Sequence, residues 1–560
     1  MEIIVFFAAA ALFVIFVFVQ GYFMDKKEQK YFEEKLRKII GKEPDKEYKI
    51  ERFIRIPGYY EKHPGEFQID DITWNDLNMD DIFQRMNYCI SSTGEEYLYY
   101  MLRTPRFDEA VLRSFDEKVE YFVSHEDDRI AFQIQMKRLG TTGKFSLYDY
   151  IDYLTKLGKR TNHKDIISIL VCVLLIIVLF YEITLGILGL VAWMLYQIFS
   201  YFKVKREIEP YITSLAYIMR MLTVAHKIEK QLPESWKEEI QSIDNALEQL
   251  KKAKKGAFWI FNSGSSKTTG NPLDIIFDYV RMVFHVDLIS FNHMLGEFIL
   301  HQKDIDMLVS TMGYLESAIS VGLYRASLVN GYAKPEFVKT GLCIEEGYHP
   351  LITAPVKNSI TAECGILLTG SNASGKSTFL KMLALNILTA QTIYTVTSKQ
   401  YQAPCAYLYS SMSLRDSLES NESYYIVEIK SIKRILDGYK SGKRPIFCFV
   451  DEVLRGTNTV ERIAASTQIL NSMNGEGIQC FAATHDIELT HLLEDIYDNY
   501  HFEEEIKEGD ILFNYQLRSG RATTRNAIKL LEIIGYDDNV IEKAQKQAKF
   551  FLEEGIWKRP

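Results

Sequence analysis

The feature that most constrains the fold is a glycine-rich stretch at residues 365–383, GILLTGSNASGKSTFLKML. Within it, GSNASGKS fits the spacing GxxxxGK[ST]; the preceding apolar run is typical of a buried strand and the following one of a helix. A loop of this kind turns several backbone N–H groups and a helix N-terminus toward phosphate. The sequence therefore predicts a strand–loop–helix unit of an α/β domain that binds ATP.

Each part of this loop has a predicted role. The Lys376 ammonium is expected near the β- and γ-phosphates, and the Ser377 hydroxyl is expected to bind Mg²⁺. A chance match in an unrelated loop is the alternative, and the flanking strand and helix patterns disfavour it. The predicted ATP-binding residues of the loop are Gly370, Ser371, Asn372, Ala373, Ser374, Gly375, Lys376, Ser377 and Thr378.

Two further apolar runs end in reactive side chains. PIFCFVDE at 445–452 ends in Asp451 and Glu452, and GIQCFAATH at 477–485 ends in His485. Because desolvating carboxylates is costly, two acids at the end of a buried strand indicate a functional site. We expect Asp451 to bind Mg²⁺, Glu452 to position or deprotonate the attacking water, and His485 to hydrogen-bond the γ-phosphate or that water. A structural histidine is the alternative for His485.

Composition places most of the chain in water. Its 560 residues, 25% charged and 47% hydrophobic, are typical of roughly two to four globular domains. The net charge of -9 predicts no general attraction to polyanions, so DNA would need a local basic patch. Seven cysteines occur singly, without CxxC pairs, which favours a reducing compartment and no zinc site.

Two apolar blocks depart from this composition. Residues 3–23 carry no charge, and residues 166–202 are apolar except for a break near Glu182. Since about 20 apolar residues can cross a membrane, we predict an uncleaved anchor at 1–24 and a spanning hairpin at 166–203. The positive-inside rule then predicts a multi-pass protein of the plasma membrane with its soluble parts in the cytoplasm. The flanking basic residues are Lys26, Lys27, Lys30, Lys156, Lys159, Arg160, Lys164, Lys203, Lys205 and Arg206.

Each block has an alternative interpretation. The first could be a signal peptide, although it lacks a basic start and a small-residue cleavage pattern. The second could be a hairpin buried in a soluble protein. The three predicted spans carry no paired charges at membrane depth, so they are expected to anchor the chain rather than conduct a solute.

Several motifs, taken in order, resemble the ATPase domain of the MutS mismatch-repair family. They are LLTGSNASGKSTFLKMLALNILTAQTIYTV, DSLESNESYYIVEI, VDEVLRGTNTVERIAA and ATHDIELTHL. The segment GYHPLI, with His349 and Pro350, resembles the part of that domain that lies against adenine. Upstream, TWNDLNMDDIFQRMNYCISSTGEEYLYYMLRTPRFDEAVL resembles the start of the family's helical core. The resemblance is strong over 340–550, moderate over 74–160 and weak over 206–335.

The resemblance implies a multidomain fold class: transmembrane helices, an all-α core and lever, and an α/β P-loop NTPase domain similar to ABC proteins. The expected segments are an anchor at 1–24, a juxtamembrane segment at 25–73, the helical core at 74–165 and 204–335 around the hairpin at 166–203, and the ATPase domain at 336–560. The stretch TTRNAIKLLEIIGYDDNVIEKAQKQAKFFLEE predicts two helices, with a stop at Gly535 and a cap at Asp537 or Asp538, that resemble the family's dimerising helices.

The family's cofactors and partners are implied in the same way. They are ATP, Mg²⁺ and a second copy of the chain, whose signature segment would complete each nucleotide site. Ser420 and Ser423 fall in that segment, and Ser423 is expected to contact the partner's γ-phosphate. Asn421 and Glu422 depart from the family's glycine and basic residue, and an acid there would repel a triphosphate unless it is paired.

The expected function is that of a membrane-anchored ATPase that switches conformation as a dimer, coupled to mismatched or branched DNA. About 50 residues lie between the first span and the helical core, too few for a sensor domain of usual size. Phe32-Glu33-Glu34 matches the sensor's Phe-x-Glu only within a charged helix, where wedging between bases is not expected. One alternative is an ATP-gated switch acting on a membrane or protein partner without DNA. The other is a solute transporter, which the few spans and the motif RGTNT disfavour.

Overall fold

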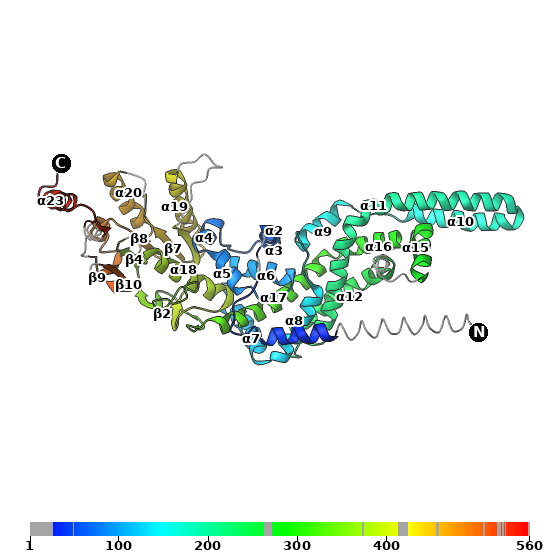
Figure 1. The fold of residues 1–560 in the computed structure, drawn as a ribbon, viewed down its shortest axis with the longest axis horizontal. Coiled ribbons are helices and arrows are strands. Elements are labelled where there is room, and N and C mark those ends of the chain that lie inside the picture. Colours follow the sequence, from blue (N-terminus) through cyan, green and yellow to red (C-terminus); the bar gives the residue numbers. More distant parts are fainter. Residues whose placement is uncertain are drawn as a thin grey trace. The chain divides into compact units, whose positions relative to one another are not determined.

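The computed structural model describes residues 26–557, except residues 47, 49, 159, 262–271, 372–373, 413–423, 455–457, 508–509, 523–527, 529–530 and 532–533. The predicted span at 1–24 and the signature serines Ser420 and Ser423 therefore lie outside the described residues. The chain forms two compact units, each assembled from several segments (Figure 1). The first unit contains Met1–Pro64, Met86–Tyr100 and Lys118–Tyr324, and the second contains Gly65–Arg85, Met101–Glu117 and Arg325–Pro560.

This division differs from the linear segments expected from the sequence. Gly65–Arg85 and Met101–Glu117, much of which was expected in the helical core, pack within the second unit. Long-range hydrogen bonds explain this placement: Ser410 Oγ donates to Asp76 Oδ2 at 2.6 Å, and the Arg106 amide donates to the Gln391 carbonyl at 2.7 Å. A helical periodicity predicts these helices but does not show which partner covers their apolar faces.

The second unit is built around a six-stranded sheet with the order β10-β9-β4-β8-β7-β6. Neighbouring strands are parallel except for β10, which pairs antiparallel with β9. The three apolar runs of the sequence form the adjacent strands β4, β8 and β7, and every residue of β4 is buried, as expected for a parallel strand covered on both faces. The strands are β4 (Gly365–Thr369), β6 (Tyr407–Ser411), β7 (Ile446–Asp451), β8 (Ile478–Ala483), β9 (Tyr497–Lys507) and β10 (Asp510–Ser519).

A smaller sheet and several helices complete this unit. The smaller sheet has the order β1-β5-β2-β3, formed by Glu336–Phe337, Gln400–Ala403, Leu342–Gly347 and Asn358–Ala362. Helix α18 (Lys376–Ile393) contacts strands of both sheets, which is why most of its side chains are buried. The other helices are α4 (Asp71–Asp76), α5 (Met79–Met86), α19 (Tyr424–Lys440), α20 (Thr459–Ser472), α21 (Ile487–Leu492) and α23 (Asp538–Glu554).

Helix α23 is the second of the two helices predicted at the C-terminal end. Asp537 is its N-cap residue and accepts a hydrogen bond from the Asn539 amide, and Gly535 precedes it with a φ of 90°. The helix therefore begins where the sequence predicts it. The first helix of the predicted pair falls on residues that the structure describes only in part.

Helices are the regular elements of the described part of the first unit. The chain passes between the two units within α6 (Ser92–Arg103), α7 (Glu109–Ser124) and α17 (Gln302–Ser327). The longer helices besides these are α8 (Glu126–Leu139), α9 (Leu147–Lys156), α10 (His163–Tyr181), α11 (Ile183–Glu229), α12 (Lys237–Gln249), α15 (Pro272–Phe284) and α16 (Val286–Leu300). The shorter ones are α2 (Ile50–Arg55), α3 (Gly58–Lys62), the 3₁₀ helix η1 (Leu250–Lys254) and α13 (Ala257–Phe261).

Helices α10 and α11 form a hairpin at the place where the sequence predicts one, with its turn at Glu182 (Figure 1). His163–Tyr181 and Ile183–Glu209 are long and apolar enough to cross a membrane, judged by length and composition. Only 6% and 11% of their most apolar windows are buried, whereas a core helix of a soluble protein is mostly buried. The hairpin thus exposes its apolar side chains.

The second predicted span ends at residue 203, within a helix that is longer than the span. Helix α11 continues without interruption to Glu229. The cluster of charged residues after Phe202 is typical of a membrane boundary, but lysine, arginine and glutamate are also good helix formers. A change of environment along the chain therefore does not require a change of secondary structure.

Candidate nucleotide-binding site

The phosphate-binding loop connects β4 to α18 in the strand–loop–helix arrangement predicted from the sequence. Its two glycines at the ends have positive φ angles, 145° at Gly370 and 104° at Gly375. A Cβ atom at Gly370 would lie 2.9 Å from the Phe502 carbonyl oxygen, so a larger residue there would be both strained and crowded. The glycines therefore allow the sharp turn that aims the first amides of α18 outward.

Lys376 is the first residue of α18, and its ammonium lies over the loop. Lys376 Nζ donates hydrogen bonds to the carbonyl oxygens of Gly370 and Ser371, each at 2.8 Å. The residue is buried, and burial lowers the pKa of Lys376. Ser371 Oγ in turn donates to Glu504 Oε2 at 2.8 Å, which ties the loop to β9.

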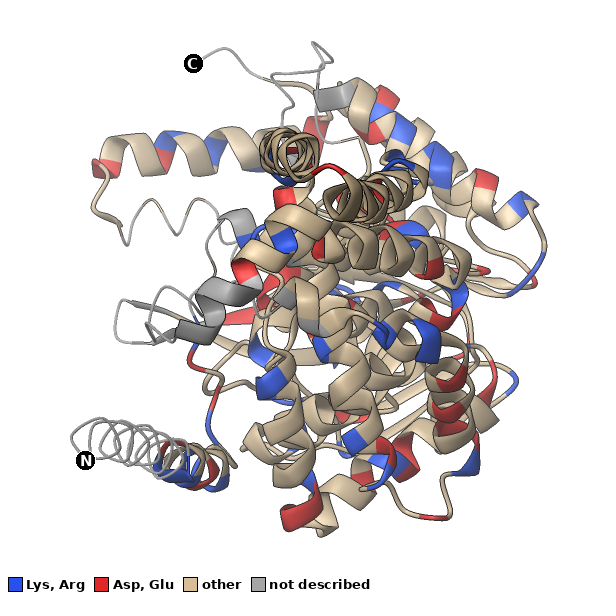
Figure 2. Cartoon of the chain, turned by 90° about the vertical axis from the view of Figure 1, so that its right-hand side faces the viewer, with Lys and Arg blue, Asp and Glu red and all other residues tan. Residues whose placement is uncertain are grey.

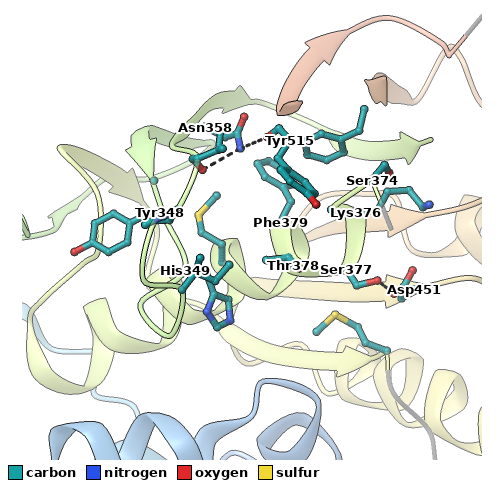
Figure 3. A pocket seen from close by; sticks show the side chains of 18 of the residues that line it. Tyr348, His349, Asn358, Ser374, Lys376, Ser377, Thr378, Phe379, Asp451 and Tyr515 are labelled. Atoms are coloured by element: carbon teal, nitrogen blue, oxygen red, sulfur yellow. Dashed lines mark hydrogen bonds between the residues drawn. The ribbon is translucent and has the colours of Figure 1, made fainter. Parts of the chain in front are cut away.

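Ser377 and Asp451, the two predicted Mg²⁺ ligands, meet at the end of the cavity shown in Figure 3. Ser377 Oγ donates a hydrogen bond to Asp451 Oδ2. Burial is the main reason why the pKa of Asp451 is raised, and the nearby charge of Glu452 acts in the same direction. One hydroxyl and one carboxylate that contact each other fit Mg²⁺, which usually takes one or two protein ligands and completes its shell with water and phosphate oxygens.

The described residues contain no cluster of three or more His, Cys, Asp or Glu side chains that could hold a metal ion. A site for Mg²⁺ at Ser377 and Asp451 does not require such a cluster, because that donor set is smaller and relies on the substrate's phosphates.

Glu452 and His485 lie side by side at the ends of β7 and β8. His485 Nε2 is 2.8 Å from Glu452 Oε1, and both side chains line the same cavity as Lys376. The Glu452 amide donates to the Ala483 carbonyl at 2.9 Å, which holds the two strand ends together. Glu452 has a φ of 59°, an uncommon conformation for a residue other than glycine, so the turn after β7 is specifically held by its surroundings.

The cavity has a volume of about 590 Å³, with polar groups at one end and apolar side chains at the other. Phosphate-binding chemistry is concentrated at the polar end, where Ser374, Gly375, Lys376, Ser377, Thr378, Asp451, Glu452 and His485 line it. The opposite end is large and apolar enough for a purine base. It is lined by Tyr348, His349, Ile352, Pro355, Val356 and Met382, while Phe379, Phe502 and Tyr515 line the cavity closer to the phosphate-binding loop.

His349 and Pro350 lie at this apolar end or next to it. The His349 imidazole is buried, and burial, with a smaller effect of Lys381, lowers the pKa of His349 to about 4. The ring is therefore neutral near neutral pH. Pro350 does not line the cavity, but its carbonyl oxygen accepts a hydrogen bond from Arg85 Nη1, which fixes the turn that follows His349.

The structure brings together most of the site residues predicted from the sequence. Gly370 and Ser371 lie in the loop without lining the cavity. Asn372 and Ala373, like Ser420 and Ser423, lie outside the described residues. The structure places Lys376, the two predicted magnesium ligands and the Glu452–His485 pair around one cavity.

Tyr515 is a cavity residue that sequence reasoning missed. It lies at a bulge in β10 with a φ of 53°, and a Cβ atom on Gly375 would be only 3.1 Å from its ring (Figure 3). Asn358 holds this bulge: its Nδ2 donates to the Tyr515 carbonyl at 3.0 Å, and its Oδ1 accepts from the Leu517 amide at 2.8 Å. No short-range pattern reveals such a bulge, because it depends on a partner 157 residues away.

Helix α4 and the turn that follows it contact the elements around the cavity, and no motif in the sequence predicts these contacts. Asp76 Oδ2 accepts a hydrogen bond from the amide of Met412, a cavity residue, at 2.9 Å. Lys381 Nζ on α18 donates to Asn78 Oδ1 at 2.6 Å. This N-terminal part of the second unit thus contacts β6 and α18 directly.

Comparison with known proteins identifies this domain. Residues 366–551, which contain the phosphate-binding loop and both reactive strand ends, match the family MutS domain V. This part of the chain is therefore a MutS-family domain. The match confirms the resemblance drawn from the motifs.

Three relatives of this chain are MutS proteins of much greater length. The DNA mismatch repair protein MutS of Thermus thermophilus is 29% identical over 235 residues, which cover 41% of this chain and 28% of the relative. MutS protein homolog 4 of Mus musculus is 29% identical over 286 residues, covering 48% and 29%. The DNA mismatch repair protein MutS of Aquifex pyrophilus is 30% identical over 255 residues, covering 43% and 29%. The chain therefore spans less than a third of these relatives.

Proposed function

We propose that this MutS-family chain binds ATP with Mg²⁺ and hydrolyses it. The observation that supports this most is the single cavity in which Lys376, the Ser377–Asp451 pair and the Glu452–His485 pair converge. Phosphoryl transfer needs little covalent chemistry from a protein, but it needs charges placed around the phosphates and a positioned water. The residues of this cavity are of the types that supply both.

Each residue has a distinct part in the proposed reaction. Lys376 and the first amides of α18 bind the β- and γ-phosphates and oppose the charge that develops on them. Mg²⁺, held by Ser377 and Asp451, supplies further positive charge. Glu452 orients the attacking water and accepts its proton, and His485, 2.8 Å away, holds the Glu452 carboxylate in place.

We further propose that the chain acts as a dimer and that ATP changes the conformation of its helical unit, coupled to DNA that is mismatched or branched. Support for DNA comes from the relatives, which are named as mismatch repair proteins. Support for coupling comes from connectivity, because α6, α7 and α17 each continue from one unit into the other. Continuous helices can transmit a displacement without an intervening flexible loop.

We propose that the α10–α11 hairpin anchors the chain in the plasma membrane. Its side chains are exposed and apolar, including Leu170 (62%), Leu188 (64%) and Phe199 (76%). Figure 2 views the chain from the end of the hairpin, whose arms are almost entirely tan, the colour of residues other than Lys, Arg, Asp and Glu. Lys164, Lys203 and Arg206 are exposed near its base, and by the positive-inside rule this supports a cytoplasmic location for the soluble units.

The second candidate function is an ATP-gated switch that acts on a membrane or protein partner without DNA. Two observations favour it: the net charge of -9 and the exposed apolar hairpin. Lys, Arg, Asp and Glu are interspersed on the helices visible in Figure 2, so charges of both signs occur close together there. DNA binding generally uses a surface of predominantly positive charge.

The experiment that separates these candidates is ATP turnover by the detergent-purified full chain. Turnover is measured alone and with duplex, mismatched, branched and single-stranded DNA at two salt concentrations. Stimulation or inhibition by DNA that weakens at the higher salt supports the DNA-coupled ATPase, because phosphate contacts are salt-dependent. Turnover that no DNA changes supports the switch without DNA, and an absence of turnover contradicts the proposed hydrolysis.

A further inference from the structure

An arginine–aspartate pair lies beside Glu452 and His485 and has no part in the chemistry proposed above. Arg462 Nε donates to Asp486 Oδ2 at 2.8 Å, and Arg462 Nη2 donates to Asp486 Oδ1 at 2.6 Å. Both side chains are largely buried, with 23% and 14% exposed. A two-pronged pair of this kind restricts orientation as well as distance, unlike a single contact between flexible charges.

The pair joins the first turns of the two helices that follow the catalytic strands. Arg462 lies in the first turn of α20, which follows β7 and Glu452, and Asp486 immediately follows His485 at the start of α21. Arg462 and Asp486 line a small cavity together with Glu452 and His485. The pair is therefore a second side-chain link, besides the Glu452–His485 contact, between the two chain segments that carry the reactive carboxylate and imidazole.

The Asp486 side chain pairs with Arg462 and does not cap its own helix. It is the N-cap residue of α21 with an extended backbone, φ -83° and ψ 102°, but its side chain caps no amide of that helix. An N-cap aspartate normally accepts such a hydrogen bond, which stabilises the helix. By contrast, Asn458 caps α20 in the usual way by accepting from the Val460 amide at 3.0 Å. The Asp486 carboxylate is thus committed to Arg462.

Backbone hydrogen bonds hold the other side of the same turn. The Thr484 amide donates to the Leu368 carbonyl at 3.0 Å, and the Asp486 amide donates to Thr484 Oγ1 at 3.0 Å. His485 lies between these contacts and the Arg462 pair. Arg462 also interacts electrostatically with the site. Its pKa is raised, first by its hydrogen bond to Asp486 and to a smaller extent by the charge of Glu452.

We infer that Arg462 and Asp486 are a positioning pair that holds His485 against Glu452 for the hydrolysis step. The inference rests on the proposed function, since it concerns the same reaction. Neither residue touches the large cavity in which the nucleotide is expected, so the pair acts on the rate of hydrolysis and leaves nucleotide affinity unchanged. A displacement of a reacting group by about 1 Å can lower a rate roughly 100-fold.

The test compares four variants of the full chain: Asp486→Asn, Arg462→Gln, Arg462→Lys, and the exchange Arg462→Asp with Asp486→Arg. For each, kcat and KM of ATP turnover, the Kd of a fluorescent ATP analogue and the melting temperature are measured. We expect kcat to fall roughly 10- to 100-fold in the first two variants while Kd changes less than about 2-fold. Arg462→Lys, which keeps the charge but not the two-pronged geometry, and the exchanged pair are expected to recover part of kcat.

Removal of an exposed ion pair is the control. Lys433 and Asp437 form such a pair on α19, so Lys433→Gln should leave kcat and Kd unchanged. If the wild-type chain hydrolyses ATP and kcat is unchanged in both Asp486→Asn and Arg462→Gln, this inference is overturned while the proposed function stands. A fall in kcat that is accompanied by weaker binding of the ATP analogue or by a lower melting temperature also overturns it. Such a combined change indicates a structural role. If the wild-type chain does not hydrolyse ATP, the proposed function fails, and the inference fails with it.

Discussion

Single residues determine whether the proposed site can bind a nucleotide and whether it can hydrolyse one. Different groups carry the two proposed abilities: Lys376 contacts the loop proposed to bind phosphate, whereas Glu452 contacts His485 and is proposed to orient the attacking water. Substitutions should therefore separate binding from hydrolysis. The sequence identified all three residues because each ends or begins an apolar element, where a charged group is unusual.

Glu452→Gln is expected to stop hydrolysis while ATP binding is retained. Glutamine preserves the size and hydrogen-bonding ability of the side chain but cannot accept the proton of water. Removing a general base usually lowers a rate by roughly 10²–10⁴-fold, so kcat should fall at least 100-fold with Kd within about 2-fold. Turnover and nucleotide binding are measured on the same preparation.

Glu488→Gln is the matched control, since Glu488 is an exposed carboxylate on α21. It should behave like the wild-type chain. Wild-type turnover in Glu452→Gln would remove Glu452 from the role of base.

Lys376→Ala is expected to weaken binding and hydrolysis together. The substitution removes the positive charge at the phosphates and the two hydrogen bonds that hold the loop carbonyls. Hydrogen bonds to a charged group contribute about 1.5–3 kcal/mol, so Kd for ATP should rise roughly 10- to 100-fold. Lys443→Ala, at an exposed lysine, should leave Kd unchanged. Wild-type affinity in Lys376→Ala would contradict the proposed orientation of the nucleotide.

At the scale of elements, the hairpin is held by close contact between its two arms. A Cβ atom on Gly186 would lie 2.5 Å from Leu179 Cα, and one on Gly189 would lie 2.6 Å from Leu175 Cδ2. Glycine at these positions allows the helices to approach, as small residues do between helices in membranes. Periodicity and hydropathy predict the two helices, but neither shows which residues face each other across the turn.

Two glycine-to-alanine substitutions should have opposite effects on stability. Gly296 lies in α16 with nothing within 4 Å of a Cβ atom, so Gly296→Ala should stabilise the helix by about 0.5–1 kcal/mol. Gly186→Ala should destabilise the hairpin, because the added methyl group meets the backbone of α10. Melting temperatures in detergent would test this, and a rise in both variants would contradict the close packing of the arms.

At the scale of the whole molecule, the helical unit buries several carboxylates within its core, among them Glu95, Glu96 and Glu316. Glu95 pairs with Arg52 and with Arg55, while Glu96 accepts a hydrogen bond from Ser146 Oγ at 2.9 Å. Burial raises the pKa of Glu96 to about 8, and burial likewise raises that of Glu316 to about 7.

This burial predicts a loss of stability as the pH rises from about 4.5 to about 8. Between pH 4.5 and about 8, the folded chain keeps a proton on Glu96 that the unfolded chain releases. The free energy of unfolding should therefore fall as the pH rises through this window and level off above it. Glu96→Gln, which cannot titrate, should lose less stability than the wild type between pH 6 and pH 9.

Melting temperatures at these two pH values provide the measurement. Glu238→Gln, at an exposed glutamate of α12, should retain the wild-type dependence on pH. If the melting temperature of Glu96→Gln depends on pH in the same way as that of the wild type, Glu96 is ionised in the folded chain at both pH values.

Features that depend on a few neighbouring residues can be predicted from the amino-acid sequence alone. The strand–loop–helix unit at Gly370–Ser377, the reactive ends of β7 and β8 and the turn of the hairpin at Glu182 all follow from local periodicity, glycine positions and the cost of burying charge. Which distant segments meet is known only from the folded chain. Tyr515 at its bulge, Asp76 against β6 and Arg462 against Asp486 are brought together by contacts between separate elements, which no local pattern encodes.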